Sequence, residues 1–214
     1  GAIAVGRNKL NMTSKPDSMR MKQAAAAVGQ CSLMYLYDKF FGDYDKTVAQ
    51  ILLNAEDIEQ EEKKENLINT FNALLEMGVI PIVNENDSVS YKEIESEDRL
   101  FGDNDMLSAV VAVLCRARHL VILSDIDGFY DHDPRLYPNA KLIEQIDTID
   151  DSVYALAGGA GSRRGTGGMR TKLQAAALAT SQGTDTIVTN GKHPEALYDI
   201  VKGLHAGTLF PGKI

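Results

Sequence analysis

Short runs rich in β-branched residues alternate along this chain with longer stretches whose apolar residues recur at helical spacing. The clearest run is Val-Ile-Pro-Ile-Val at 79–83, which directly follows an amphipathic stretch at 60–77. A period of two residues or a short buried run indicates a strand, and a period near 3.6 indicates a helix. Strands that alternate with helices favour a mainly parallel sheet covered on both faces, because each crossover places a helix against the sheet. We therefore predict an α/β fold.

The expected elements follow this alternation from one end of the chain to the other. Gly78 gives the helix before it a stop signal, and the charge run at 56–65 is expected to form a solvated helix face. No repeat, low-complexity tract or linker interrupts the pattern, so we expect one domain. The expected helices are 18–41, 60–77, 106–114, 151–157, 169–181 and 194–201. The expected strands are 47–53, 79–83, 120–123, 142–146, 186–188 and 208–210.

The charge balance narrows the classes of partner. Acidic residues outnumber basic ones by 30 to 22, which gives a formal net charge of −8. An acidic surface repels nucleic acids and anionic membranes, so we expect neither as a partner. No apolar run approaches the roughly 20 residues that cross a bilayer. The two cysteines and four histidines show no metal-ligand spacing, so we expect no metal site built by the protein and place the chain in the reducing cytoplasm.

Two acidic loops stand where a parallel sheet carries its chemistry, at the carboxyl ends of strands or the starts of helices. Asn-Glu-Asn-Asp at 84–87 follows the strand expected at 79–83 and offers carboxylates and amides that could hold an ammonium or hydroxyl group; a plain turn is the alternative. Gly-Asp-Asn-Asp at 102–105 precedes the helix expected at 106–114. Helix capping explains one Asp or Asn but not three in a row. The surplus indicates a ligand or oriented catalytic lysines.

A third loop, at 158–172, combines glycines with two arginines and a lysine before a helix. Glycine lets the backbone approach an anion closely, and a helix start offers free N–H groups with a partial positive charge. These are the requirements of a polyphosphate, although the spacing is not that of a Walker A loop. A flexible surface loop is the alternative. Ser124 and Asp125 close the strand expected at 120–123 and are either a turn or part of a nucleotide pocket.

Taken together, these segments resemble the glutamate 5-kinases, a branch of the amino acid kinase family. The loops at 84–87, 102–105 and 165–172 stand in the family's order and at its separations, a highly specific combination. The resemblance extends over essentially the whole chain. The matching segments are 1–4, 25–30, 84–87, 102–105, 123–130, 133–135, 165–172 and 173–176.

The resemblance implies an activity and its participants. Such enzymes transfer the γ-phosphoryl group of ATP, with Mg²⁺, to the side-chain carboxylate of L-glutamate, as the first step of proline synthesis. The implied fold is a three-layer α/β/α sandwich with a mainly parallel sheet, in agreement with the periodicity. The resemblance also implies a homo-oligomer, either a dimer or a tetramer, and makes proline a candidate feedback inhibitor.

The resemblance further assigns roles to residues of this chain. Asp105 matches the aspartate that orients the catalytic lysines, and Lys172 matches one of those lysines. Asp87 and Asn104 match substrate-binding positions, and Asn84 and Asp103 stand in the same motifs as further candidates. The ATP-binding positions are Ser124, Asp125, Thr166, Gly167, Gly168, Met169, Arg170, Thr171 and Lys172.

The sequence departs from the family pattern at its start. Family members begin with a strand and a Lys-x-Gly-Ser/Thr phosphate loop, neither of which precedes Gly1 here. We therefore expect residues 1–214 to be an amino acid kinase domain without that strand and loop, and without the RNA-binding-like C-terminal domain of many members. One alternative is another amino acid kinase, acting on acetylglutamate, aspartate or carbamate. A non-catalytic fragment that senses nucleotide or proline is the other.

Overall fold

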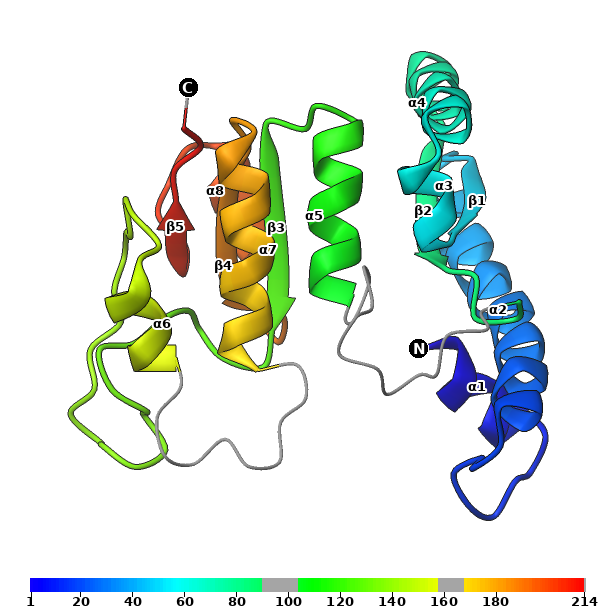
Figure 1. Ribbon diagram of the computed structural model, residues 1–214, viewed down its shortest axis with the longest axis horizontal. Coiled ribbons are helices and arrows are strands. Elements are labelled where there is room, and N and C mark those ends of the chain that lie inside the picture. Colours follow the sequence, from blue (N-terminus) through cyan, green and yellow to red (C-terminus); the bar gives the residue numbers. More distant parts are fainter. Residues whose placement is uncertain (90–103, 158–167, 214) are drawn as a thin grey trace. The chain divides into compact units, whose positions relative to one another are not determined.

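Helices and strands alternate along the chain, as the apolar periodicity predicts (Figure 1). The computed structural model describes residues 1–89, 104–157 and 168–213. The chain divides into two units, Gly1–Gly102 and Asp103–Ile214, each with its own strands and helices. The expectation of a single domain stays a prediction. None of the helices in the described ranges has both the length and the apolar composition that crossing a bilayer requires.

The first unit contains one parallel strand pair and four helices. The register of the pair runs from Val48 opposite Ile80 to Leu53 opposite Glu85. The Ser18 hydroxyl accepts a hydrogen bond from the Met21 amide at 3.4 Å and so starts the long second helix at the predicted position. The elements are α1 (Ala2–Lys9), α2 (Met19–Gly42), β1 (Val48–Leu53), α3 (Ala55–Glu59), α4 (Glu61–Glu76) and β2 (Ile80–Glu85).

Helices α1 and α2 contact each other through their backbones. A Cβ atom placed on Gly29 would lie 1.8 Å from the carbonyl oxygen of Ala2, and one placed on Gly6 would lie 1.7 Å from that of Ala25. Glycine permits this approach because it has no side chain to separate the helices. The hydrophobic periodicity did not predict α1, since its contact is made by glycine and alanine.

The charge run at 56–65 forms parts of two helices instead of one continuous face. Helix α3 ends at Glu59 and α4 begins at Glu61, with Gln60 between them in an extended conformation. The Asp57 carboxylate accepts a hydrogen bond from the Asn54 amide at 2.8 Å, which stabilises the start of α3. Helix α4 ends at Glu76, and Gly78, the predicted stop signal, follows the C-cap with a φ of 71° that allows the closing turn.

The second unit is built around a three-stranded sheet. Strands β3 and β4 are parallel, and β5 pairs with β4 in the antiparallel direction, so the sheet order is β3-β4-β5. Helices α5 and α7 pack side by side and contact β3 and β4 (Figure 1). The elements are α5 (Asn104–Leu114), β3 (His119–Ser124), α6 (Asp151–Ala157), α7 (Met169–Ser181), β4 (Asp185–Asn190), α8 (Ala196–Val201) and β5 (Thr208–Phe210).

Large apolar side chains fill the interior of the second unit. Leu173 of α7, Val188 of β4 and Phe210 of β5 are almost completely buried in one cluster, which also includes small residues of α5 and α7. Burial of such side chains from several elements fixes the helices against the sheet.

The prediction of a strand at 142–146 is wrong. The segment makes only two isolated bridges, from Leu142 to Tyr130 and from Gln145 to Leu209. The segment therefore pairs first with the loop after β3 and then with β5 at the edge of the sheet. Because it changes partner within four residues, it forms no continuous ladder.

Candidate active site

Asp105 and Lys172 form an ion pair between the starts of two helices. Lys172 Nζ donates to Asp105 Oδ2 at 2.9 Å, and the Thr171 hydroxyl donates to the same oxygen at 3.0 Å. The two charged side chains are only 13% and 12% exposed. Asp105 lies in the first turn of α5, and Thr171 and Lys172 lie in the first turn of α7. The predicted pairing of an aspartate with a lysine 67 residues away is therefore a direct contact.

The start of α7 favours an anion. A helix N-terminus carries a partial positive charge and free N–H groups, and the Lys172 ammonium adds to that charge. Gly168, at the N-cap position, has no side chain to accept hydrogen bonds from those groups. Helices α5 and α7 both begin at the end of the unit where β3 and β4 end, so the ion pair lies at the carboxyl edge of the sheet (Figure 1). Ligands bind at this edge in α/β proteins.

Hydrogen bonds tie together the loops that leave β3 and β4 at this edge. The Gly191 amide donates to the carbonyl oxygen of Ser124 at 2.7 Å. Asn190 Nδ2 donates to Asp127 Oδ1 at 2.6 Å, and the Tyr130 hydroxyl donates to Asp127 Oδ2 at 3.0 Å. The Ser124 hydroxyl donates to Asp125 Oδ1 at 3.3 Å. Ser124 and Asp125, two of the predicted nucleotide-binding residues, thus belong to an edge where hydrogen bonds join the two loops.

The Asp127 carboxylate is held in its charged form. The hydrogen bond from Asn190 has the largest effect, followed by that from Tyr130, and together they place the pKa of Asp127 below its ordinary value. Burial and then the hydrogen bond to Asp127 raise the pKa of Tyr130. The roles of Asp127 and Asn190 in joining the loops were not predicted. The available signal was an Asn-Gly pair directly after the apolar run of β4.

The first unit contains a cavity of about 440 Å³ beside the end of β2 and the residues that follow it. This volume is in the range of small-molecule sites. Asp87, a predicted substrate-binding residue, lines it, together with Glu85, the last residue of β2. The remaining lining residues are Ala2, Ala26, Ala27, Gln30, Cys31, Met34, Gln50, Leu52, Asn86 and Ser88.

Asn84 uses its side chain within the protein. Its Nδ2 donates to Gln30 Oε1 at 3.0 Å, and its Oδ1 accepts from the Glu85 amide at 3.0 Å. Sequence reasoning did not select Gln30 as a site residue, although it ends the family-matching segment 25–30, because a single glutamine in an alanine-rich helical stretch does not indicate a cavity.

The other predicted residues are distributed as follows. Asn104 is the exposed first residue of α5, Met169 packs against the core, and Arg170 is exposed. Asp103, Thr166 and Gly167 lie outside the described residues. The structure therefore brings together Asp105, Thr171 and Lys172 in the second unit. In the first unit, Asn84 belongs to β2, which extends two residues beyond the strand expected at 79–83, and Asp87 lies in the turn that follows.

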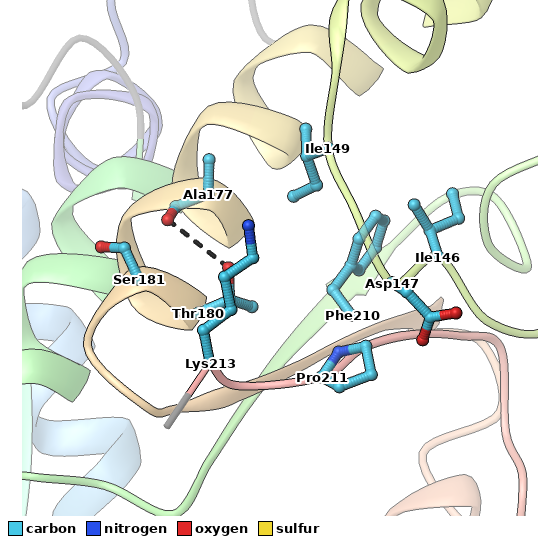
Figure 2. Close-up of a pocket in the computed structure, with 9 residues that line it drawn as sticks. All are labelled: Ile146, Asp147, Ile149, Ala177, Thr180, Ser181, Phe210, Pro211 and Lys213. Atoms are coloured by element: carbon cyan, nitrogen blue, oxygen red, sulfur yellow. Dashed lines mark hydrogen bonds between the residues drawn. The ribbon is translucent and has the colours of Figure 1, made fainter.

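A smaller cavity, of about 60 Å³, lies beside the C-terminal half of α7 (Figure 2). Thr180 and Ser181 line it on the helix. Phe210, the last residue of β5, lines it on the other side, together with Pro211 and Lys213 from the segment after β5. The Thr180 hydroxyl donates to the carbonyl oxygen of Ala177 at 3.4 Å and so remains engaged within its own helix. A cavity of this size has room for a few water molecules and not for a nucleotide.

A model of the amino acid kinase family matches residues 1–190. The chain belongs to this family. Its predicted family and its predicted α/β fold are therefore both confirmed.

Within the amino acid kinase family, the sequence groups with the glutamate 5-kinases. It is 54% identical to the glutamate 5-kinase of Clostridium perfringens over 213 residues, which are 100% of this chain and 79% of the relative. It is 48% identical to that of Listeria innocua, again over the whole chain and 77% of the relative. Identity at this level over the full chain distinguishes the branch from other amino acid kinases.

Solved structures of other kinases have the same fold. The carbamate kinase from Giardia lamblia bound to AMP-PNP aligns with a TM-score of 0.61 at 17% identity, covering 99% of this chain and 81% of that one. The isopentenyl phosphate kinase of T. acidophilum aligns with a TM-score of 0.60 at 19% identity, covering 96% and 78%. These likenesses establish the amino acid kinase fold, and the roles of individual site residues stay predictions.

Proposed function

We propose that this amino acid kinase transfers the γ-phosphoryl group of ATP to the side-chain carboxylate of L-glutamate, forming L-glutamyl 5-phosphate for proline biosynthesis. The whole-chain similarity to glutamate 5-kinases supports the substrate pair. The structural observation that carries the proposal is the Asp105–Lys172 ion pair at the carboxyl edge of the sheet.

Phosphoryl transfer to a carboxylate makes limited chemical demands on the protein. The acceptor is already an anion, so neither a protein nucleophile nor a general base is required. The barrier comes from bringing two negatively charged groups together and aligning them. Lys172 supplies a positive charge for the transferred phosphoryl group. Asp105 holds the lysine in position, and the Thr171 hydroxyl holds Asp105. The first-turn amides of α7 receive other phosphate oxygens.

Mg²⁺ enters with the nucleotide as part of the MgATP substrate. Within the described ranges, no three His, Cys, Asp or Glu side chains gather closely enough to hold a metal ion. A magnesium ion bound to ATP takes most of its ligands from phosphate and water and needs at most one or two protein carboxylates. The donor set of this chain therefore suits a nucleotide-borne ion.

The cavity of the first unit is the proposed glutamate site. Its carboxylates, Glu85 and Asp87, suit the α-ammonium group of a free amino acid. Acetylglutamate has a neutral amide at that position and would leave a desolvated carboxylate without its cation, at a cost of about 1–3 kcal/mol or more. Aspartate is one methylene shorter, and a small misplacement of the attacking carboxylate costs about 10²-fold in rate.

Substrate selectivity tests the proposed function. Coupled assays of ADP release with L-glutamate, acetylglutamate and aspartate should give a kcat/KM for glutamate on the order of 10²-fold above either analogue. An equal or higher value for acetylglutamate or aspartate would assign the chain to another branch of the family.

The finer properties of the enzyme are also proposed. It acts in the cytoplasm as a homo-oligomer, with proline as feedback inhibitor. The two free cysteines support a reducing compartment, and exposed aromatic residues of α2, including Tyr35 and Phe40, support self-association. Light scattering on the purified enzyme tests the assembly, because a monomer would exclude it. Glutamate saturation curves that proline leaves unchanged would exclude the inhibition.

A further inference from the structure

Among the described residues of the first unit, Gln30 is the only polar residue whose side chain is buried. It is 8% exposed, lies on α2 and lines the 440 Å³ cavity together with Asp87. A buried carboxamide is costly unless both its carbonyl oxygen and its NH₂ group find partners. The partners of these two groups therefore indicate what Gln30 does.

The orientation of the Gln30 carboxamide follows from a backbone group. The Glu85 amide can only donate, so the side-chain atom of Asn84 that it contacts is the oxygen. The Asn84 NH₂ group then faces Gln30, and Gln30 must present its own oxygen in return. The Nε2 of Gln30 is consequently turned away from Asn84. It donates to no acceptor among the residues that the structure describes, and its side chain borders the cavity.

The geometry points to Gln30 as a specificity-determining residue whose Nε2 donates to the α-carboxylate of the bound amino acid, an inference that rests on the proposed function. Glu85 and Asp87 attract the ammonium group of an amino acid but repel its carboxylates. A neutral amide donor on the same wall satisfies a carboxylate without competing for the ammonium group. The α-carboxylate fits this role better than the side-chain carboxylate, because a hydrogen bond to the attacking oxygen would reduce its nucleophilicity.

Gln30→Glu separates this role from mere support of Asn84. One carboxylate oxygen of the new side chain still accepts from Asn84 Nδ2, so the anchor of the loop is retained. The other oxygen replaces Nε2 and directs a negative charge at the substrate carboxylate. The KM for L-glutamate should rise on the order of 10²-fold, with the KM for ATP unchanged. Gln23→Glu adds the same charge to α2 outside the cavity lining and should leave the KM for glutamate unchanged.

4-Aminobutyrate is the matching substrate probe, because it is glutamate without the α-carboxylate. Gln30→Glu should lower the preference for glutamate over 4-aminobutyrate on the order of 10²-fold, measured as the ratio of kcat/KM values. A purely structural role would lower both values together and leave this ratio unchanged. If Gln30→Glu does not fold, Gln30→Met removes Nε2 without adding charge and should lower the ratio about 10-fold.

The outcomes distinguish this inference from the proposed function. A parent enzyme that does not phosphorylate glutamate contradicts the proposed function itself. An active parent whose folded Gln30→Glu variant keeps its KM for glutamate within about threefold, or keeps the substrate ratio, contradicts only the role of Gln30.

Discussion

Helices α1 and α2 of the first unit contact each other backbone to backbone at Gly6 and Gly29, whereas the second unit is filled by large side chains such as Leu173 and Phe210. The contact between α1 and α2 has no space for added atoms, whereas the core of the second unit would be left with a cavity if side-chain atoms were removed. The same family fold therefore contains two regions with opposite sensitivities to side-chain volume. Substitutions that add a methyl group or relieve a strained residue make this difference measurable.

Gly29→Ala should disrupt the first unit most strongly. The added Cβ would lie 1.8 Å from the Ala2 carbonyl oxygen, so the helices must separate, and the free energy of unfolding should fall by about 3 kcal/mol. Gly42→Ala, in the last position of the same helix, is the matched control because nothing lies within 4 Å of its new Cβ. It should leave stability unchanged or raise it by up to about 1 kcal/mol. Urea unfolding measures both, and equal midpoints would refute the close contact.

The ends of α4 and α5 provide a smaller comparison between the units. Gly78 closes α4 with a φ of 71°, whereas Arg116 closes α5 with a φ of 50°. The left-handed conformation costs a residue with a side chain about 1 kcal/mol, part of which a glycine gives back in unfolded-state entropy. Arg116→Gly should therefore stabilise by about 0.5 kcal/mol, and Gly78→Ala should destabilise by a similar amount, about 0.5 kcal/mol. Thermal melts that shift in the opposite directions would contradict this account of the two turns.

Local patterns in the sequence predicted most of the fold. The amphipathic pattern of 60–77 and its glycine stop correspond to α4 and Gly78, and the apolar runs correspond to the parallel pairs. Helix α1 was missed because glycine contacts leave no hydrophobic period. The segment 142–146 was misjudged because its partners, Tyr130 and Leu209, are set by tertiary structure.

The candidate site was predictable only in part. Resemblance to a family paired Asp105 with Lys172, and the structure supplies the distance, the burial and the support from Thr171. Gln30 could not be found, because its role depends on an orientation fixed by the Glu85 backbone through Asn84. Short motifs carry residue identity, but a buried amide acquires its function from the groups around it.

Turnover of Lys172→Ala, Asp105→Asn and the double variant tests the central claim most directly. If the ion pair acts as one unit on the transferred phosphoryl group, each single change should lower kcat on the order of 10²-fold or more, with a smaller effect on the KM for ATP. The double variant should then be little worse than the more impaired single variant, because the second change removes an interaction already lost. Melting temperatures near that of the parent would show that the loss is catalytic. A kcat within a few-fold of the parent in either single variant, or fully multiplicative losses in the double variant, would contradict the account.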